Sequence, residues 1–279
     1  MSEYRIITDS CADLTDEMRD ELGAEEMIPF YLHIAGEVIT DDYTLNIPVL
    51  LSKMKACTEK MTSSCADPQA WKSAFEKAKK AFGITIGATL SATFSSANAG
   101  LNMAIEESGI EGYVFDSQSA VSGETLIAYK LRDFINEGLS MQEIIKKTEA
   151  FILKMKTFFI LDDVSNLVKN GRMNHITGTL VQILGIKPIL GEKEGRIELF
   201  DKVRGYKNIA DKMVSMIGKS GRDISDDDYF VISHCNNYSL AKDIFDKVKE
   251  QYNFSKMWIV EMKGLSSFYA SDKGICMSF

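Results

Sequence analysis

The first half of the sequence alternates short apolar segments with longer amphipathic ones, and this alternation restricts the fold more than any other feature. The apolar segments are rich in Ile, Val, Tyr, Phe and Thr, as β-strands are, and they lie at residues 5–9, 27–34, 84–89 and 113–116. Strands that are separated by helices pair in parallel through right-handed crossovers. The first half therefore predicts a three-layer α/β/α domain around a parallel sheet.

Two of the connecting segments carry clear helix signals. Residues 67–83 begin with Asp67 as the cap and Pro68 in the first helical position, and a glycine is expected to end the helix. Its apolar side chains recur at helical spacing, at Trp71, Ala74, Phe75, Ala78 and Phe82. A second helix is expected to begin at the capping box formed by Ser140 and Glu143.

The second half of the sequence predicts a mixed sheet. Residues 181–203 indicate an apolar helix, a strand, a turn at 192–195 and a second strand. Strand candidates at 229–234 and 256–262 flank a helix at 239–252, whose apolar residues have helical spacing. We therefore expect a second α/β domain, with a different type of sheet from the first.

Length and composition are those of a soluble globular protein with two ordinary domains or one large one. The 279 residues are 45% hydrophobic and 26% charged. We expect an N-terminal α/β domain with hydroxyl-rich loops over 1–155 and a C-terminal α/β domain over 156–279, with segments able to cross between them. No run approaches the roughly 18 apolar residues of a membrane span, and the first residues have no signal-peptide pattern. These observations predict a cytoplasmic protein without stable membrane insertion.

The net charge and the placement of Cys and His restrict which partners and metals this protein is expected to bind. A net charge of -8 and a pI near 5.1 argue against nucleic acid as a partner. The five cysteines form no CxxC pair and are an odd number, and the three histidines lie far apart. We therefore expect no disulfide framework, no metal site and no cofactor.

Four loops in the first half are unusually rich in hydroxyl side chains. They lie at 8–15, 61–67, 89–96 and 115–124. Ser, Thr and Asp are common helix caps, so one such loop alone would indicate capping only. Four of them favour a shared site, because loops at the carboxyl ends of parallel strands gather on one rim of the sheet.

The residues in these loops suggest an anion site, although two alternatives stay open. Ser91, with Thr62 and Ser63, could hold an anion through hydroxyls and the free amides of a helix that begins near Ser95. A nucleophilic serine is the first alternative, but there is no GxSxG motif and no histidine in the four loops. A nucleotide or phosphate site is the second, but GxGxxG and GxxxxGK[ST] are both missing.

Several segments of the chain resemble the successive signature blocks of the bacterial DegV family. They are IITDSCADLT, the TS pair at 62–63, LSATFSSA, FDSQSAVSGE, LDDVSNLVKNGRMNHITGTLVQILGIKPIL and the KVR element at 202–204. Each block is weak alone. Together they run in the order of the family and cover nearly the whole chain, so the sequence is identified as a member of the DegV family.

The resemblance implies a two-domain α/β protein that binds a long-chain fatty acid between its domains. It implies no catalytic activity and no cofactor, and a separate ATP-dependent fatty acid kinase as partner, which would phosphorylate the presented carboxylate. Thr62, Ser63 and Ser91 match the carboxylate-binding loops, and Arg204 matches a basic residue near the head group. Arg172 matches the arginine that docks on the kinase.

The acyl chain would supply the affinity in such a protein. The expected tunnel-lining residues are Phe94, with Ala92 beside it in the same loop, together with Leu90, Phe30 and the apolar segment 181–186. The alternative for each apolar side chain is an ordinary place in the core.

The chain departs from the family at its C-terminus. Tyr269 stands where many members have a histidine near the head group, and residues 271–273 replace a Gly-Pro-Gly turn. A phenol with a pKa near 10 cannot supply a titratable cation at neutral pH. A fatty-acid-binding or sensing protein without a kinase partner is therefore the second function class. An enzyme that acts on a small phosphorylated substrate is the third.

Overall fold

The first sheet is parallel and comes from the N-terminal half of the chain. The computed structural model describes residues 4–173 and 185–279. The first sheet has the order β2-β1-β6-β7. Its strands are β1 (Tyr4–Asp9), β2 (Glu26–Ile28), β6 (Lys80–Thr85) and β7 (Glu111–Asp116).

Helices cover both faces of this sheet, as the alternation of strand and helix predicts. Ile6 points to a core formed with α1 (Asp16–Leu22), α5 (Ser122–Asn136) and α6 (Met141–Lys154). Its neighbour Ile7 points to the opposite core, against α3 (Pro68–Phe75) and α4 (Thr93–Ser108). Successive strand residues face opposite sides, so the two cores define three layers, and the predicted α/β/α arrangement is confirmed.

The second sheet is mixed and comes from the C-terminal half. Its order is β10-β9-β8-β13-β11-β12, and only the pair β11 and β12 is parallel. The strands are β8 (Thr157–Ile160), β9 (Ile186–Lys193), β10 (Arg196–Arg204), β11 (Tyr229–His234), β12 (Lys256–Glu261) and β13 (Ile275–Ser278). The helices α9 (Ile209–Lys219) and α10 (Tyr238–Gln251) pack on one face. The predicted mixed sheet is therefore confirmed.

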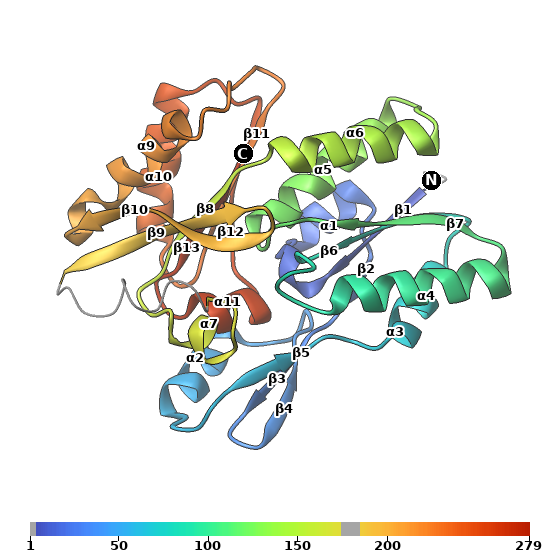
Figure 1. Cartoon of the computed structure of the whole chain (residues 1–279), viewed down its shortest axis with the longest axis horizontal. Coiled ribbons are helices and arrows are strands. Elements are labelled where there is room, and N and C mark those ends of the chain that lie inside the picture. Colours follow the sequence, from blue (N-terminus) through green and yellow to red (C-terminus); the bar gives the residue numbers. More distant parts are fainter. Residues whose placement is uncertain (1–3, 174–184) are drawn as a thin grey trace.

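The helix α5 lies between the two large sheets (Figure 1) and joins them into one structure. Its side chains belong to a single apolar cluster that also includes Val231 and Val260 of the second sheet. Tyr129 of α5 stacks on Trp258 of β12, with the ring centroids 4.0 Å apart. Residues of the two halves therefore share a continuous core along this helix.

A small third sheet lies at the bottom of the view in Figure 1. It has the order β4-β3-β5, and its strands are β3 (Tyr31–Ile34), β4 (Glu37–Thr40) and β5 (Thr62–Ser64). The nearby helices are α2 (Ile47–Ala56), α7 (Ser165–Lys169) and α11 (Gly264–Ala270). Leu265 and Phe268 of α11 share a buried cluster with Leu32 of β3, so the C-terminal helix packs on N-terminal elements. The turns η1 (Ser10–Ala12) and η2 (Tyr206–Asn208) complete the described elements.

The predicted strand over 27–34 is wrong in one respect, because two strands of different sheets share that segment. β2 ends at Ile28 in the parallel sheet, and β3 begins at Tyr31 in the small antiparallel sheet. Pro29 has no amide hydrogen to continue the first ladder. The amide of Phe30 donates to Ser10 Oγ at 3.1 Å, which turns the chain from one sheet to the other.

The predicted helix over 67–83 is too long, and the strand placed at 84–89 begins earlier. The helix α3 ends at Phe75, and residues 80–85 form β6. Phe82, expected on the helix, lies in the strand and stacks on Tyr4. β6 is a central parallel strand, and such strands are apolar on both faces. Phe82 therefore happened to fall at the spacing of the apolar residues of the preceding helix, and the predicted helix was drawn too long.

Other local predictions agree with the structure. The capping box of Ser140 and Glu143 is present. The turn within 192–195 is a two-residue hairpin connection, in which Glu194 and Gly195 both have positive φ, as a type I′ turn requires. The expected helix at the start of 181–203 falls largely outside the described residues.

Candidate ligand-binding cavity

A cavity of about 350 Å³ lies between the two halves and is open to one side. All four hydroxyl-rich loops contribute to its wall, through Cys11, Ser63, Ser91 and Ser119 among others. Other parts of the wall come from β8, the β9–β10 hairpin and α11. The cavity therefore lies where the carboxyl ends of the parallel strands meet the second sheet, which is the usual place for a ligand in such folds.

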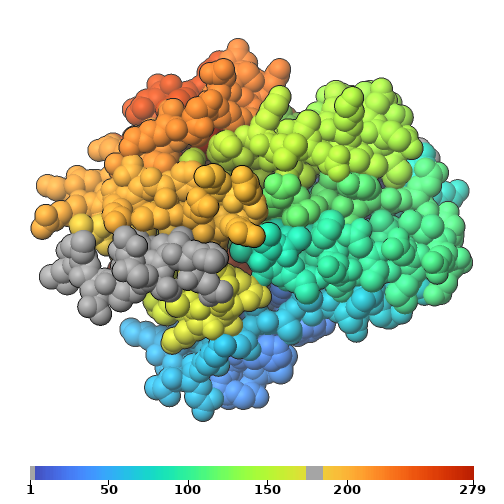
Figure 2. Space-filling model, in the orientation of Figure 1, coloured from blue at the N-terminus to red at the C-terminus, as the bar shows by residue number. Residues whose placement is uncertain are grey.

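The tip of the β9–β10 hairpin closes one side of this cavity. Thr89 Oγ1 donates a hydrogen bond to the carbonyl oxygen of Gly195 at the tip. Figure 2 shows the hairpin, in gold, against the green surface of the N-terminal half. A loop of the first half thus holds a hairpin of the second half over the cavity.

The structure places the predicted ligand residues in two groups. Ser63, Ser91, Ala92 and Tyr269 line the cavity. Arg172, which was expected to dock on a kinase, lines it as well.

The remaining three predicted residues, Thr62, Phe94 and Arg204, are not part of the cavity wall. Thr62 and Ser63 are neighbours in β5, so their side chains point to opposite sides of the strand. Phe94 packs against the core under α3 and α4. Arg204 is exposed at the end of β10.

Tyr269 and Ser63 meet at one end of the cavity. The phenolic oxygen of Tyr269 lies 2.8 Å from Ser63 Oγ, and either hydroxyl can donate. Both side chains are half-buried. A strand of the N-terminal half and a helix of the C-terminal half thus place two neutral hydroxyls side by side.

Ser91 lies at the same end, just before α4. Its Oγ accepts a hydrogen bond from the amide of Thr93 at 3.2 Å, which satisfies one of the free amides at the helix start. That bond occupies a lone pair and leaves the hydroxyl proton available. Ser91 can therefore cap the helix and donate to an anion at the same time.

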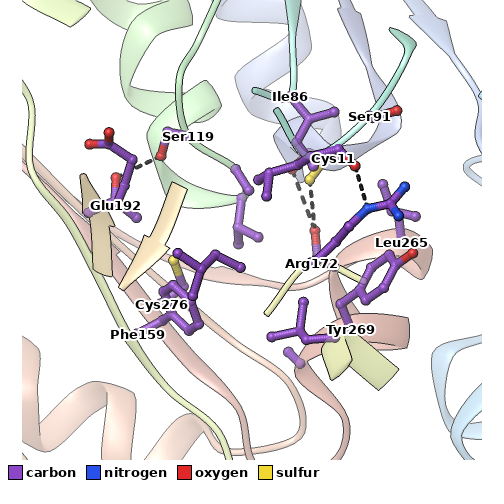
Figure 3. Close-up of a pocket in the computed structure, with 18 of the residues that line it drawn as sticks. Cys11, Ile86, Ser91, Ser119, Phe159, Arg172, Glu192, Leu265, Tyr269 and Cys276 are labelled. Atoms are coloured by element: carbon purple, nitrogen blue, oxygen red, sulfur yellow. Dashed lines mark hydrogen bonds between the residues drawn. The ribbon is translucent and has the colours of Figure 1, made fainter. Parts of the chain in front are cut away.

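Arg172 brings a positive charge to this end of the cavity, as Figure 3 shows. Its Nε donates to the carbonyl oxygen of Leu90 at 2.6 Å, and its Nη1 donates to the carbonyl oxygen of Asn170. The guanidinium is half-buried and fixes the loop that carries Ser91.

Much of the cavity wall is apolar. It includes Phe30, Ile86, Leu90, Phe159, Leu161 and Leu265. Phe30 and Leu90 are two of the expected tunnel-lining residues. In the expected segment 181–186, residues 181–184 lie outside the described part of the chain.

Buried carboxylates that the sequence analysis did not single out support this wall. Asp41 accepts from the amides of Gly264 (2.9 Å) and Leu265 (2.7 Å), at the start of α11. Asp9 accepts from the amides of Cys11 (3.0 Å) and Ile86 (2.9 Å). Burial raises the pKa of both Asp9 and Asp41 to about 6. Their role depends on the amides of Ile86, Gly264 and Leu265, which lie far from them in the sequence. The sequence alone therefore does not reveal it.

Two further carboxyl groups lie in the same region. Asp13 Oδ1 accepts from the amide of Lys263 at 2.7 Å, and Ser266 is a further polar neighbour of this carboxyl group. Glu124 is fully buried, with the Asp9 carboxyl and the Cys11 thiol as its polar neighbours. Burial raises the pKa of both groups well above their ordinary values, and the nearby Asp9 adds to the effect at Glu124.

Fold and cavity together define a two-domain α/β protein with a mainly apolar site between its halves. The sequence profile of the DegV family, described as that of an uncharacterised protein family, matches residues 3–278. A DegV domain-containing protein of Streptococcus pyogenes serotype M3 is 32% identical over 279 residues, which are 99% of this chain and 99% of that protein. The chain therefore belongs to the DegV family.

Solved structures of similar proteins contain fatty acids. A DegV family protein from Ruminococcus gnavus, refined with vaccenic acid, has a TM-score of 0.94 at 32% identity over 100% of both chains. The Fatty Acid Kinase (Fak) B3 protein of Streptococcus pneumoniae, loaded with linoleic acid, has a TM-score of 0.88 at 30% identity, and the match covers 100% of this chain and 99% of that one. A DegV family protein from Eubacterium eligens, loaded with heptadecanoic acid, has a TM-score of 0.90 at 28% identity over 99% and 98% of the two chains.

Within residues 4–173 and 185–279, no helix is both long and apolar enough to cross a membrane. Over the same described ranges, no group of three or more His, Cys, Asp or Glu residues is arranged to hold a metal ion.

The buried carboxyl groups predict a fall in stability as the pH rises. Because the folded-state pKa of Asp13 lies above its ordinary value of 3.8, the folded protein binds more protons than the unfolded chain above about pH 4. Stability should therefore fall as the pH rises from 5 to 8, and Asp13→Asn should make that fall smaller, because Asn does not titrate. Asn also tolerates the positive φ of residue 13.

Urea unfolding at pH 5 and pH 8 measures this difference. Asp16→Asn is the matched control, because Asp16 is an exposed carboxylate whose pKa is lowered by Arg19. The same pH dependence in the wild-type protein and in Asp13→Asn would contradict the assignment.

Proposed function

We propose that this protein binds a long-chain fatty acid in the cavity and presents its carboxylate to a separate ATP-dependent kinase. The observation that carries the proposal is the composition of the cavity wall, which is mainly apolar and brings Ser63, Ser91, Tyr269 and the Arg172 guanidinium together. The fatty acids in the similar structures from R. gnavus and S. pneumoniae support it. In this proposal the protein has no catalytic activity of its own and acts in the cytoplasm, where its partner finds ATP.

The carboxylate would lie at the end formed by Ser63, Ser91 and Tyr269. Hydroxyl and amide donors give a carboxylate charge-assisted hydrogen bonds. The first amides of α4 are close to Ser91, and the dipole of this helix favours an anion there. Arg172 adds a positive charge at the same end, although its Nε and Nη1 are already hydrogen-bonded to carbonyl groups. Thr62, Phe94 and Arg204 have no part in this proposal, since they do not line the cavity.

The acyl chain would supply most of the affinity. Burial of each CH₂ group contributes about 0.8 kcal/mol, so a sixteen-carbon chain gains on the order of 10 kcal/mol before the costs of ordering. The wall offers aromatic and branched side chains such as Phe30, Phe159 and Leu161 for this contact. Affinity would thus depend on chain burial, and the head-group contacts would set the orientation.

A kinase partner is supported by the printed name of the S. pneumoniae relative. A carrier or sensor without a kinase is the second candidate, and the position of Tyr269 favours it. The hydroxyl of Tyr269 is engaged with Ser63, and a phenol has no cationic form to offer near the carboxylate. The two candidates agree on the ligand and differ only in what happens to it.

Protein purified from a bacterial host should contain a fatty acid. A mainly apolar cavity with a hydroxyl-lined end should fill from the lipids of the host. Denaturing extraction followed by mass spectrometry measures the ligand and its amount. An empty protein that also fails to take up added oleate or palmitate would refute the proposal.

Ser91→Ala should weaken the binding of free fatty acids much more than the binding of their methyl esters. The substitution removes one charge-assisted hydrogen bond, worth roughly 1.5–3 kcal/mol, or about ten- to a hundredfold in affinity. The ester has no anionic head group and does not depend on that bond. Affinities of both ligands for the wild-type protein and the variant test this, and equal losses would assign Ser91 to the shape of the cavity.

Arg172→Ala should lower the yield of acyl-phosphate per bound fatty acid if a kinase docks at this end. The reconstituted reaction with a fatty acid kinase measures that yield, and the bound fatty acid is measured in the same samples. Lys169→Ala is the control, because Lys169 is a nearby cation of α7 that does not line the cavity. A variant that loses only bound lipid would assign Arg172 to the head group alone, and no acyl-phosphate from the wild-type protein would favour the second candidate.

A further inference from the structure

The cavity has a second polar region, away from the proposed head-group end. Ser119 and Thr157 line the cavity there, with 3% and 4% of their surface exposed. Figure 3 shows Ser119 and Glu192 on one side of the cavity and Ser91, Arg172 and Tyr269 on the other. Neither Ser119 nor Thr157 is needed to hold a carboxylate at the opposite end.

Ser119 and Thr157 begin a chain of four buried hydroxyls that leads away from the cavity. Ser119 Oγ lies 2.7 Å from Thr157 Oγ1, which lies 2.9 Å from Ser278 Oγ. Ser278 Oγ lies 2.8 Å from Ser122 Oγ, and Ser122 donates to Cys276 Sγ at 3.3 Å. Four hydroxyls, from one loop, the start of α5 and the strands β8 and β13, are thus linked end to end.

The bond from Ser122 to sulfur gives the chain of hydroxyls one direction. Either oxygen can donate in each of the three oxygen–oxygen contacts, and Ser122 donates to Cys276 Sγ. With the Ser122 proton used in this way, Ser278 donates to Ser122, Thr157 to Ser278 and Ser119 to Thr157. In this arrangement all four protons stay within the chain, and Ser119 Oγ presents an acceptor to the cavity.

The loop that carries Ser119 is held in an unfavourable backbone conformation. Gln118 and Val121 both line the cavity and have positive φ, and Val121, a β-branched residue, has φ 58° and ψ -120°. Such conformations cost on the order of 1–3 kcal/mol each. A Cβ on Gly123 would lie 2.2 Å from Ser119 Oγ, so the glycine makes room for the hydroxyl. The loop geometry keeps Ser119 at the cavity wall.

The carboxylate of Glu192 restricts which group of a ligand could pair with Ser119. Glu192 lines the cavity on the same side, and its Oε1 accepts from the amide of Gly195 at 2.6 Å. A second carboxylate on the ligand would be repelled by Glu192 and could not donate to Ser119. A hydroxyl is neutral and can donate, so it fits both conditions.

We infer that this side of the cavity is a subsite for a hydroxyl group on the acyl chain, so that the protein accepts hydroxylated long-chain fatty acids. The inference rests on the proposed function, since the ligand must first be a fatty acid. The hydroxyl of the ligand donates to Ser119 Oγ. Without that acceptor, a hydroxyl in an apolar cavity loses its hydrogen bonds to water and receives none in return.

The test compares octadecanoic acid with a positional series of hydroxyoctadecanoic acids, in which the hydroxyl is moved along the distal half of the chain. Wild-type protein should bind at least one of these acids as tightly as octadecanoic acid or more tightly. Ser119→Ala should lower the affinity for that acid by about three- to tenfold more than the affinity for octadecanoic acid, because one neutral hydrogen bond is lost. Ser91→Ala is the matched control and should weaken both ligands in equal proportion.

Each outcome of this test is decisive. The inference is wrong if every hydroxylated acid binds wild-type protein more weakly than octadecanoic acid does, and this comparison requires no variant to fold. It is also wrong if Ser119→Ala weakens both classes of ligand equally, which would place the carboxylate at Ser119. If no fatty acid of either class binds, the proposed function itself fails, and that result differs from a normal affinity for octadecanoic acid without a preference for hydroxyls.

Discussion

Two buried carboxylates hold the amino end of α11, and the shape of the cavity depends on that contact. Asp41 accepts from the amides of Gly264 and Leu265, and Asp13 accepts from the amide before them, at sequence separations of 223 to 250 residues. The helix has no side-chain cap of its own, so the N-terminal half satisfies the amides that a helix start leaves free. Because the helix is fixed in this way, Tyr269 reaches Ser63 and completes one end of the cavity.

The arrangement of the two large sheets depends on helix α5, which packs on both of them. It forms one core with β1 and β6 on one side and with β11 on the other. The cavity lies beside this permanent contact and is bounded by loops and by the β9–β10 hairpin. The two halves are thus joined by contacts of α5 that do not involve the cavity. The loop before α5 also carries Ser119, so the same element supports the core and one wall of the site.

Periodicity predicted most of the fold, because burial repeats along a strand or a helix in a way that the sequence displays. It failed where one apolar run serves two elements, as at Pro29 and Phe82. It also gave no sign of β13, a short strand whose partners β8 and β11 lie far away in sequence. The hydroxyl-rich loops were expected on one rim of the sheet, because the carboxyl ends of parallel strands lie together. Residues of all four loops line the cavity at that rim. Asp41 could not be recognised, because its role consists of two backbone amides contributed by a distant helix.

Two apolar clusters border the cavity. Phe30 and Leu265 belong to one cluster, and Leu161 and Leu167 to the other, and all four side chains line the cavity. In the proposed function, an acyl chain would pack against both clusters. A ligand that binds only the folded state adds about 2.7 kcal/mol of stability at a concentration of one hundred times its Kd. The melting temperature of a purified sample would then report its lipid occupancy as well as its sequence.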